Sequence, residues 1–466
     1  MQRRLSIFLV LILSLTAMTV TVQAADTATL PQGQTTMAEL PMDLQHTIFT
    51  SIHGDMASAP SASGTVPEQQ AYLKPFNTER FDGFGFSVAV DGDTVVVGAY
   101  QEASAAGAAY VFTRDGDTWT QQAYLKADNA EVGDLFGYSV AVDDDTVVVG
   151  ARFEDGSATT VNGPDDNAAE DAGAAYVFTR GGTTWSQQAY LKADNAGAGD
   201  WFGWSVAVDG DTVVVGARQE DGSATTVNGP DNDLAFRAGA AYVFTWGGGT
   251  WSQQAYLKAD NTGNFGNSVA VDSDTVVVGA PGGSGAAYVF TWGGGTWSQQ
   301  AYLKADNAEG GDQFGWSVAV DGDTAVMGAP SETSPVFGGA AYVFTRVGTT
   351  WSQQAYLKAA NAGSRFSDNF GESVAVDGDT VVVGAPDEDG SATTVNGPDD
   401  NSARNAGAAY VFTRVGTTWS QQAYIKASNT GNSDQFGWSV AVDGDTAVVG
   451  ARLEGGSATT VNGPDD

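Results

Sequence analysis

Acidic side chains recur at fixed places in one long loop of this 466-residue chain. Residues 154–167 return nearly unchanged at 220–232, 388–401 and 454–466. Carboxylates beside backbone carbonyls at glycine turns are the oxygen ligands that Ca²⁺ prefers. The pattern favours a solvated acidic rim, leaves Ca²⁺ binding open and requires no cofactor. The candidate metal ligands are Asp155, Asp165, Asp166, Asp221, Asp231, Asp389, Asp399 and Asp400.

Aromatic residues form a second candidate set, because they follow a recurring Phe-Gly pair. Rings beside acidic acceptors can stack on a sugar or grip a peptide, although packing between neighbouring elements is the simpler interpretation. One acidic loop also holds an apolar and basic patch at residues 234–237. The candidate ligand-binding residues are Tyr138, Trp204, Trp316 and Trp438 after Phe-Gly, and Phe236 and Arg237 in the patch.

The sequence lacks the combinations of residues that common catalytic mechanisms require. The chain has no cysteine, and its two histidines, His46 and His53, lie outside the repeats described below. Thiolate zinc sites, cysteine nucleophiles and a Ser-His-Asp triad are therefore excluded. A glycosidase would need two carboxylates in unlike environments, and the residues that depart from the repeat do not supply such a pair. We therefore expect that this protein is not an enzyme.

The charge balance excludes further classes of protein. Fifty-six acidic and 20 basic residues give a net charge of -36, which would repel a phosphate backbone and argues against nucleic-acid binding. A hydrophobic content of 42% with 11% aromatic residues is too high for a disordered chain. A large buried core is therefore expected.

The N-terminal residues have the features of a secretory signal. Arg3 and Arg4 precede an apolar run at residues 5–22, and Val22-Gln23-Ala24 offers a small-x-small cleavage site. We predict a signal peptide at residues 1–24, with a membrane anchor as the weaker alternative, and an Ala/Thr/Ser/Pro-rich segment and linker at 25–67. The protein is then secreted, to the extracellular space or cell surface of a bacterium, with no membrane span after cleavage.

One unit is repeated through the rest of the chain. Its Phe-Gly pair recurs at residues 84, 136, 202, 265, 314, 370 and 436, a spacing of 49 to 66 residues. Each unit carries four β-branched and aromatic runs, such as 136–142, 146–151, 173–179 and 185–192, bounded by Gly, Asp and Asn. Asp-Gly between the first two runs is typical of a tight hairpin. Four antiparallel strands repeated about seven times predict an all-β, seven-bladed β-propeller over residues 68–466.

Each predicted outer strand ends in a lysine. A lysine on an exposed edge strand discourages edge-to-edge association, and this is the role we expect for these residues. They are Lys74, Lys126, Lys192, Lys258, Lys304, Lys358 and Lys426.

The strand count predicts that the last blade is incomplete. There are seven first, seven second and seven outer strands, the earliest outer strand being residues 69–74, but only six third strands. The printed sequence stops at Asp466, inside a loop whose other copies lead to the third strand. We expect a truncated sequence of 27 strands in which the N-terminal segment supplies the outer strand of the seventh blade. A weaker alternative places residues 47–51 in the gap.

These motifs resemble a known family. Phe-Gly-x-Ser-Val-Ala-Val, then Val-Val-Val-Gly-Ala-Pro, then Gly-Ala-Ala-Tyr-Val-Phe, is similar to the FG-GAP repeat over residues 68–466. The resemblance implies the seven-bladed propeller of integrin α subunits and of related secreted bacterial proteins. In four units the proline is replaced by Tyr100, Arg152, Arg218 or Arg452. The integrin-type calcium loop between the first two strands does not carry over, because residues 90–94 are too few to wrap an ion.

The resemblance and the residues together suggest a secreted, non-enzymatic module for binding or adhesion. Its partner is expected to be an extracellular protein or glycan, and the chain a monomer or part of a longer multidomain protein. Two alternatives remain open: a glycosidase-like carbohydrate-active propeller and a purely structural cell-surface repeat protein.

Overall fold

A computed structural model describes residues 67–77, 79, 81–260, 263–334, 337–362, 368–455 and 459–463. The chain divides into two units, Met1–Val66 and Pro67–Asp466. The predicted signal peptide, most of the predicted linker and the strand candidate at residues 47–51 lie outside the described residues. Within the described part of the chain, no helix has the length and apolar character needed to cross a membrane.

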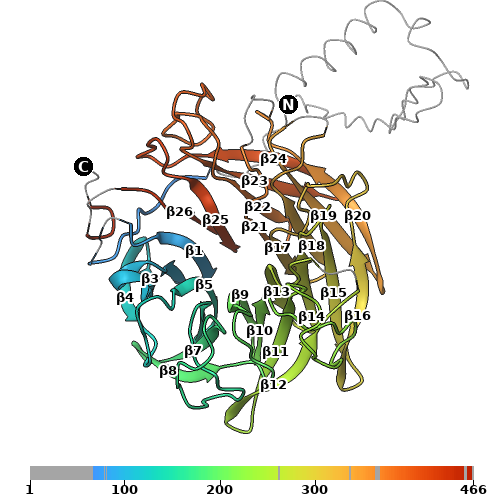
Figure 1. Ribbon diagram of the computed structural model, residues 1–466. Coiled ribbons are helices and arrows are strands. Elements are labelled where there is room, and N and C mark those ends of the chain that lie inside the picture. The colour runs from blue at the N-terminus through green and yellow to red at the C-terminus, as the bar shows by residue number, and fades with distance from the viewer. Residues whose placement is uncertain are drawn as a thin grey trace, which may run out of the picture. The chain divides into compact units, whose positions relative to one another are not determined.

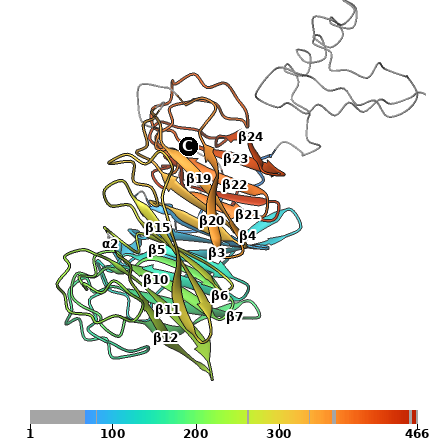
Figure 2. The ribbon, with the colours of Figure 1, turned by 90° about the vertical axis from the view of Figure 1, so that its right-hand side faces the viewer.

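The second unit is a ring of β-sheet blades, as predicted. Figure 1 shows them following one another from the blue blade 1 to the red blade 7, and Figure 2 shows the same blades from the side. Six blades are four-stranded sheets in which each strand pairs with the next along the chain, and the seventh has two strands. All pairings between strands are antiparallel. The all-β, seven-bladed fold with an incomplete last blade is therefore confirmed.

The strands have nearly equal bounds from blade to blade. Blades 1 to 3 are β1 (Phe84–Asp91), β2 (Thr94–Ala99), β3 (Ala108–Asp115), β4 (Thr118–Leu125), β5 (Phe136–Asp143), β6 (Thr146–Ala151), β7 (Ala174–Gly181), β8 (Thr184–Leu191), β9 (Phe202–Asp209), β10 (Thr212–Ala217), β11 (Ala240–Gly247) and β12 (Thr250–Leu257). Blades 4 to 7 are β13 (Ser268–Asp272), β14 (Thr275–Ala280), β15 (Ala286–Gly293), β16 (Thr296–Leu303), β17 (Val318–Asp321), β18 (Thr324–Ala329), β19 (Ala340–Val347), β20 (Thr350–Leu357), β21 (Val374–Asp377), β22 (Thr380–Ala385), β23 (Ala408–Val415), β24 (Thr418–Ile425), β25 (Phe436–Asp443) and β26 (Thr446–Ala451). A single turn, α2 (Glu102–Ala105), lies in blade 1.

The core lies between blades rather than inside any one sheet. Every residue of β2 and β14 is buried, because a Val-Val-Val strand has one apolar face toward each neighbouring blade. One core cluster joins Val148 of blade 2 to Phe202 and Val213 of blade 3. Each blade therefore completes its core only against the next blade.

Pairs of glycines bring the backbones of neighbouring blades together. A Cβ atom added to Gly98 of β2 would collide with the carbonyl oxygen of Gly137 in β5, and Gly137 itself has a φ of 87°. The same collision links Gly450 of blade 7 with Gly85 of blade 1. The glycines of the Phe-Gly and Gly-Ala motifs are thus required by close backbone approach, and this contact closes the ring.

Aspartates at the tight turns also link the blades. The Asp91 carboxylate accepts a hydrogen bond from the backbone N–H of Asp144 in blade 2 (2.8 Å). Across the closure, Asp443 accepts one from Gly92 N–H (2.9 Å). Asp91 and Asp443, which lie at tight turns, therefore stabilise the interfaces between blades.

The N-terminal segment takes the outer position of blade 7. The backbone N–H of Asn462 donates to the carbonyl of Tyr72 (2.8 Å), and Tyr72 N–H donates to Asn462 Oδ1 (2.8 Å). Asn162 and Tyr190 make the same pair of bonds in blade 2. Residues 69–74 join no sheet, so the described residues hold 26 strands rather than the 27 predicted.

The expected role of the outer-strand lysines is wrong. Lys192 is fully buried, and its Nζ contacts Glu154 Oε2 (2.8 Å) and the Gly173 carbonyl (2.7 Å). The reason is that the loop after the second strand folds back over the lysine and supplies a glutamate. Ion pairs of this kind are Lys74–Glu454, Lys126–Glu102, Lys192–Glu154, Lys258–Glu220, Lys358–Glu332 and Lys426–Glu388.

Candidate functional site

Three long loops between the second and third strands share one internal frame. They are residues 152–173, 218–239 and 386–407. In the first of them, the buried Glu154 carboxylate accepts hydrogen bonds from Tyr190 Oη (2.7 Å) and from Gly156 N–H (3.0 Å), beside its ion pair with Lys192. Glu220 and Glu388 make the same bonds in the other two. A buried carboxylate that is fully hydrogen-bonded fixes the root of each loop.

The predicted metal-ligating aspartates bond within and around this frame. Asp166 accepts hydrogen bonds from Ser157 N–H (3.0 Å) and Oγ (2.7 Å), which lower the pKa of its carboxyl. Hydrogen bonds from Ser391 and Ser402 lower the pKa of Asp400 to about 2. The Oδ1 atoms of Asp155, Asp221 and Asp389 accept backbone N–H groups farther along the same loop.

The remaining candidates are exposed and separate from these. Asp231 accepts a hydrogen bond from Asn195 Nδ2 and Asp399 from Asn361 Nδ2, both at 3.1 Å, and Asp165 lies at the surface. Across the described ranges, no three acidic or histidine side chains form a group that could hold a metal ion. Calcium binding at these loops stays a prediction.

The tips of the three loops carry different side chains, although their backbone hydrogen bonds are equivalent. The N–H groups of Ala169, Ala235 and Ala403 donate to equivalent aspartate carbonyls. Around these alanines, each loop shows a different set of side chains. Leu234 and Phe236 are each 78% exposed, and the Arg237 guanidinium lies 4.8 Å from the Phe236 ring. The three sets are Ala168, Glu170 and Asp171; Leu234, Phe236 and Arg237; and Ser402, Arg404 and Asn405.

The aromatic residues after Phe-Gly meet at the inner ends of adjacent blades, where Figure 1 shows β1, β5, β9 and β25 facing the middle of the ring. Ring centroids are 4.8 Å apart for Phe86 and Tyr138, 5.0 Å for Tyr138 and Trp204, and 5.6 Å for Phe86 and Trp438. Trp316 lies farther round the ring, and its carbonyl accepts a hydrogen bond from Asn267 Nδ2 (2.7 Å). The candidates Tyr138, Trp204 and Trp438 are thus brought together with Phe86, whereas Phe236 belongs to a loop tip.

Three arginines stack on these rings. The Arg152 Cζ atom lies 4.0 Å from the Tyr138 ring centroid and 4.7 Å from that of Trp204. Arg218 lies 4.5 Å from Trp204, and Arg452 lies 3.2 Å from Trp438. We call this set the arginine–aromatic cluster: Arg152, Arg218, Arg452, Tyr138, Trp204, Trp316 and Trp438.

Sequence reasoning missed these arginines as functional residues. Each of them replaces the proline after Gly-Ala. Within a single unit, this replacement is a minor departure from the repeat. The available signal was that the departures fall in units 7, 1, 2 and 3, which are neighbours only once the ring is closed.

Burial dominates the electrostatics of the cluster. It lowers the pKa of the Arg152 and Arg218 guanidinium groups and raises the pKa of Tyr138, which the three arginines partly offset. Glu372, in the blade 6 position that follows Phe-Gly, has a pKa raised to about 7 by burial. Its charge and that of Asp387 act on Arg452.

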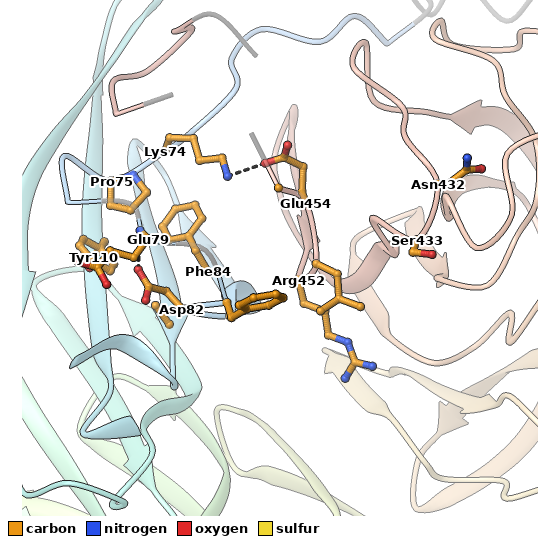
Figure 3. A pocket seen from close by; sticks show the side chains of 15 residues that line it. Lys74, Pro75, Glu79, Asp82, Phe84, Tyr110, Asn432, Ser433, Arg452 and Glu454 are labelled. Carbon is orange, nitrogen blue, oxygen red and sulfur yellow. Dashed lines mark hydrogen bonds and ion pairs between the residues drawn. The ribbon is translucent and has the colours of Figure 1, made fainter. Parts of the chain in front are cut away.

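A pocket of about 260 Å³ lies at the junction of blades 7 and 1. Figure 3 shows Lys74, Phe84 and Tyr110 on one side, Arg452 on the other, and the Lys74–Glu454 ion pair (2.5 Å) spanning it. At each of the other six junctions, the glycine before the third strand forms a bridge to the next Phe-Gly phenylalanine. No such bridge reaches Phe84 among the described residues, so the pocket lies where the third strand begins in other blades.

The chain is similar to a known protein family. The model of the FG-GAP repeat matches seven stretches, residues 67–112, 119–178, 185–244, 251–290, 297–344, 351–412 and 419–464. No curated protein matches the chain.

Proposed function

The chain belongs to the FG-GAP repeat family, and from this we propose that its propeller is a secreted, non-enzymatic module that binds an extracellular protein or glycan. FG-GAP repeats occur in extracellular proteins. The proposed export depends on the signal sequence predicted at residues 1–24, and the proposed source is a bacterium. The module acts as a monomer or as part of a longer multidomain protein.

The observation that carries this proposal is the constant loop frame with variable tips. Three loops share the same glutamate anchor and the same backbone hydrogen bonds, yet they display different exposed side chains. Arg237 takes a φ of 55°, an unfavourable region for a long side chain. Binding residues carried on loops of a rigid scaffold are typical of recognition proteins. Leu234, Phe236 and Arg237 supply the apolar and cationic contacts of the proposed surface.

Grafting one loop tip onto another tests the proposal. The variant L234A/F236E/R237D gives the blade 3 loop the tip side chains of the blade 2 loop, which the same frame already supports. We expect the wild-type chain to bind cells, matrix proteins or a glycan array, and the graft to weaken that binding about tenfold or more, as loss of a central aromatic and arginine does.

The melting temperature provides the control for this graft. It should stay within about 1 °C of the wild type, because the replaced side chains are exposed. Wild-type protein that binds none of these targets would overturn the proposed function. Undiminished binding by the graft would keep the function and remove this loop as the contact.

A further inference from the structure

Two arginines of the arginine–aromatic cluster lack the ion pairs that other arginines in the described part of the chain form. Among the described residues Arg152 and Arg218 form no ion pair and no hydrogen bond, and the Nε atom of each is buried without a partner. The arginines at the ends of the third strands behave differently, since Arg180 and Arg346 each contact an aspartate at 2.6 Å. A buried hydrogen-bond donor without a partner costs free energy. An acceptor bound at these two guanidinium groups would remove that cost.

The rings hold these guanidinium groups in place. Both guanidinium groups pack on the Trp204 ring, with Arg152 Cζ at 4.7 Å and Arg218 Cζ at 4.5 Å from its centroid. Trp201 stacks on Trp204 with centroids 5.5 Å apart and an interplanar angle of 10°. The arginines are therefore oriented before any ligand arrives, which reduces the entropy cost of binding.

The charge of the site is opposite to that of the molecule. Arg152 lies close enough to Arg218 for its positive charge to lower the pKa of the Arg218 guanidinium. Arg452 adds a third cation, and the carboxylates of Glu372 and Asp387 act on that arginine. The charge of Asp171 acts on Arg152, but neither Arg152 nor Arg218 forms an ion pair among the described residues. In a chain of net charge -36, this pair of guanidinium groups is a local site for an anion.

We propose that the arginine–aromatic cluster binds an acidic sugar, with a carboxylate or sulfate group against Arg152 and Arg218. This inference rests on the proposed binding function and names its ligand. Guanidinium groups match the geometry of both anions, and the half-buried indoles of Trp204 and Trp316 offer apolar surface to a pyranose ring. The acidic loops on the same face repel a polyacidic peptide at long range, whereas a single anionic group on a sugar meets less repulsion.

Calorimetric titration of the full chain tests this proposal with defined probes. A glucuronate-terminated oligosaccharide and a 6-sulfated galactose oligosaccharide represent the two anions. A neutral glucose oligosaccharide, inorganic sulfate and poly-glutamate are the comparisons. We expect at least one acidic sugar to bind ten or more times as tightly as the neutral one, and its affinity to fall as salt rises.

Matched variants assign the binding to the two arginines. R152Q/R218Q keeps side-chain length and should weaken acidic-sugar binding 100-fold or more, since each charge-assisted bond lost costs about tenfold or more. R180Q/R346Q removes the same charge from ion-paired arginines elsewhere and should leave the affinity within twofold. Melting curves of both variants check that they fold.

Several outcomes would overturn the inference. They are equal affinity for neutral and acidic sugars, undiminished binding by R152Q/R218Q, and binding of inorganic sulfate or poly-glutamate as tight as that of the acidic sugars. A chain that binds cells or matrix proteins but neither acidic sugar would contradict this inference alone. A chain that binds nothing at all would contradict the proposed function as well.

Discussion

Asp200 illustrates how burial sets the chemistry of a single residue in this fold. It lies between blades 2 and 3 and is 8% exposed, and Gly197 N–H donates to its Oδ2 atom (2.7 Å). Burial nevertheless raises the pKa of the Asp200 carboxyl to about 8, with smaller contributions from Glu220 and Asp221. In an unfolded chain this pKa is about 4.

The pH dependence of stability follows from that difference. Between pH 4 and 8 the folded protein holds a proton that the unfolded chain has released. The contribution of Asp200 to stability is therefore fully present below about pH 4 and is lost as pH rises through about 8. Asp200→Asn removes this titration, so we expect the free energy of unfolding of the variant, relative to wild type, to rise by roughly 1 kcal/mol or more between pH 5 and pH 8.

Asp400 provides a control of opposite sign. Its pKa is lowered to about 2, so its contribution is present above about pH 4 and is lost as pH falls toward 2. Asp400→Asn should therefore leave the pH 5 to 8 slope unchanged. Denaturant unfolding at the two pH values measures both variants, and equal slopes for Asp200→Asn and wild type would contradict the assignment.

The Lys–Glu pair is a structural element that joins an outer strand to a loop. Lys192 of the segment after β8 and Glu154 of the loop after β6 are both buried, and the glutamate also receives the Tyr190 hydroxyl. Each charge depends on the other, because an uncompensated charge in the interior is strongly unfavourable. The pair therefore ties the position of the loop to the integrity of the blade.

Removing one partner tests this coupling. Lys192→Met leaves the Glu154 carboxylate buried and unpaired, and should lower the free energy of unfolding by about 3 to 5 kcal/mol. Lys304→Met is the matched control, because Lys304 Nζ bonds Ser284 Oγ (2.6 Å) and the Gly285 carbonyl (2.8 Å) and forms no ion pair among the described residues. It should cost clearly less. The double variant K192M/E154Q should recover part of the loss, and equal costs for both lysines would refute the coupling.

At the scale of elements, the sequence predicted more of the strands than of their contacts. Val-Val-Val runs, Asp-Gly turns and the repeated Phe-Gly pair determine strand order and pairing locally, and these predictions are confirmed. The role of Lys192 could not be predicted in the same way, because its partner Glu154 lies 38 residues away in a loop. A polar loop gives no local signal that one of its glutamates folds inward.

The arginine–aromatic cluster escaped prediction for a related reason. Trp438 and Arg452 come from blade 7 and Tyr138 from blade 2, and only ring closure makes these blades near neighbours. The rings after Phe-Gly lie at the inner ends of these blades. Nothing in a single repeat showed that arginines would stack on them.

At the scale of the whole molecule, the two ends of the described unit close the ring. Asn462 and Tyr72, which are 390 residues apart in sequence, exchange two hydrogen bonds. Blade 3 has the same pair in Asn228 and Tyr256, but there the tyrosine belongs to β12, which pairs with β11. In blade 3, sheet pairing also holds the tyrosine in place. In blade 7, the two bonds to Asn462 hold a segment that joins no sheet.

Asn462→Ala tests this difference against Asn228→Ala. Each substitution removes one side-chain acceptor from a tyrosine N–H. We expect hydrogen exchange at the Tyr72 amide to accelerate tenfold or more in the first variant, because residues 69–74 belong to no sheet. The Tyr256 amide should accelerate only a few-fold in the second. Equal acceleration at the two amides would show that blade 7 is no less restrained than blade 3.

The closure also sets an order of events in time. Residues 69–74 are made about 390 residues before Asn462, which at roughly 5 to 20 residues per second is a delay of about 20 to 80 s. Blades 1 to 6 can each complete their core as soon as the next blade has been synthesised. The first segment of the ring to be synthesised must therefore wait without its partner until the last, and a nascent chain of this protein stays an open arc for most of its synthesis.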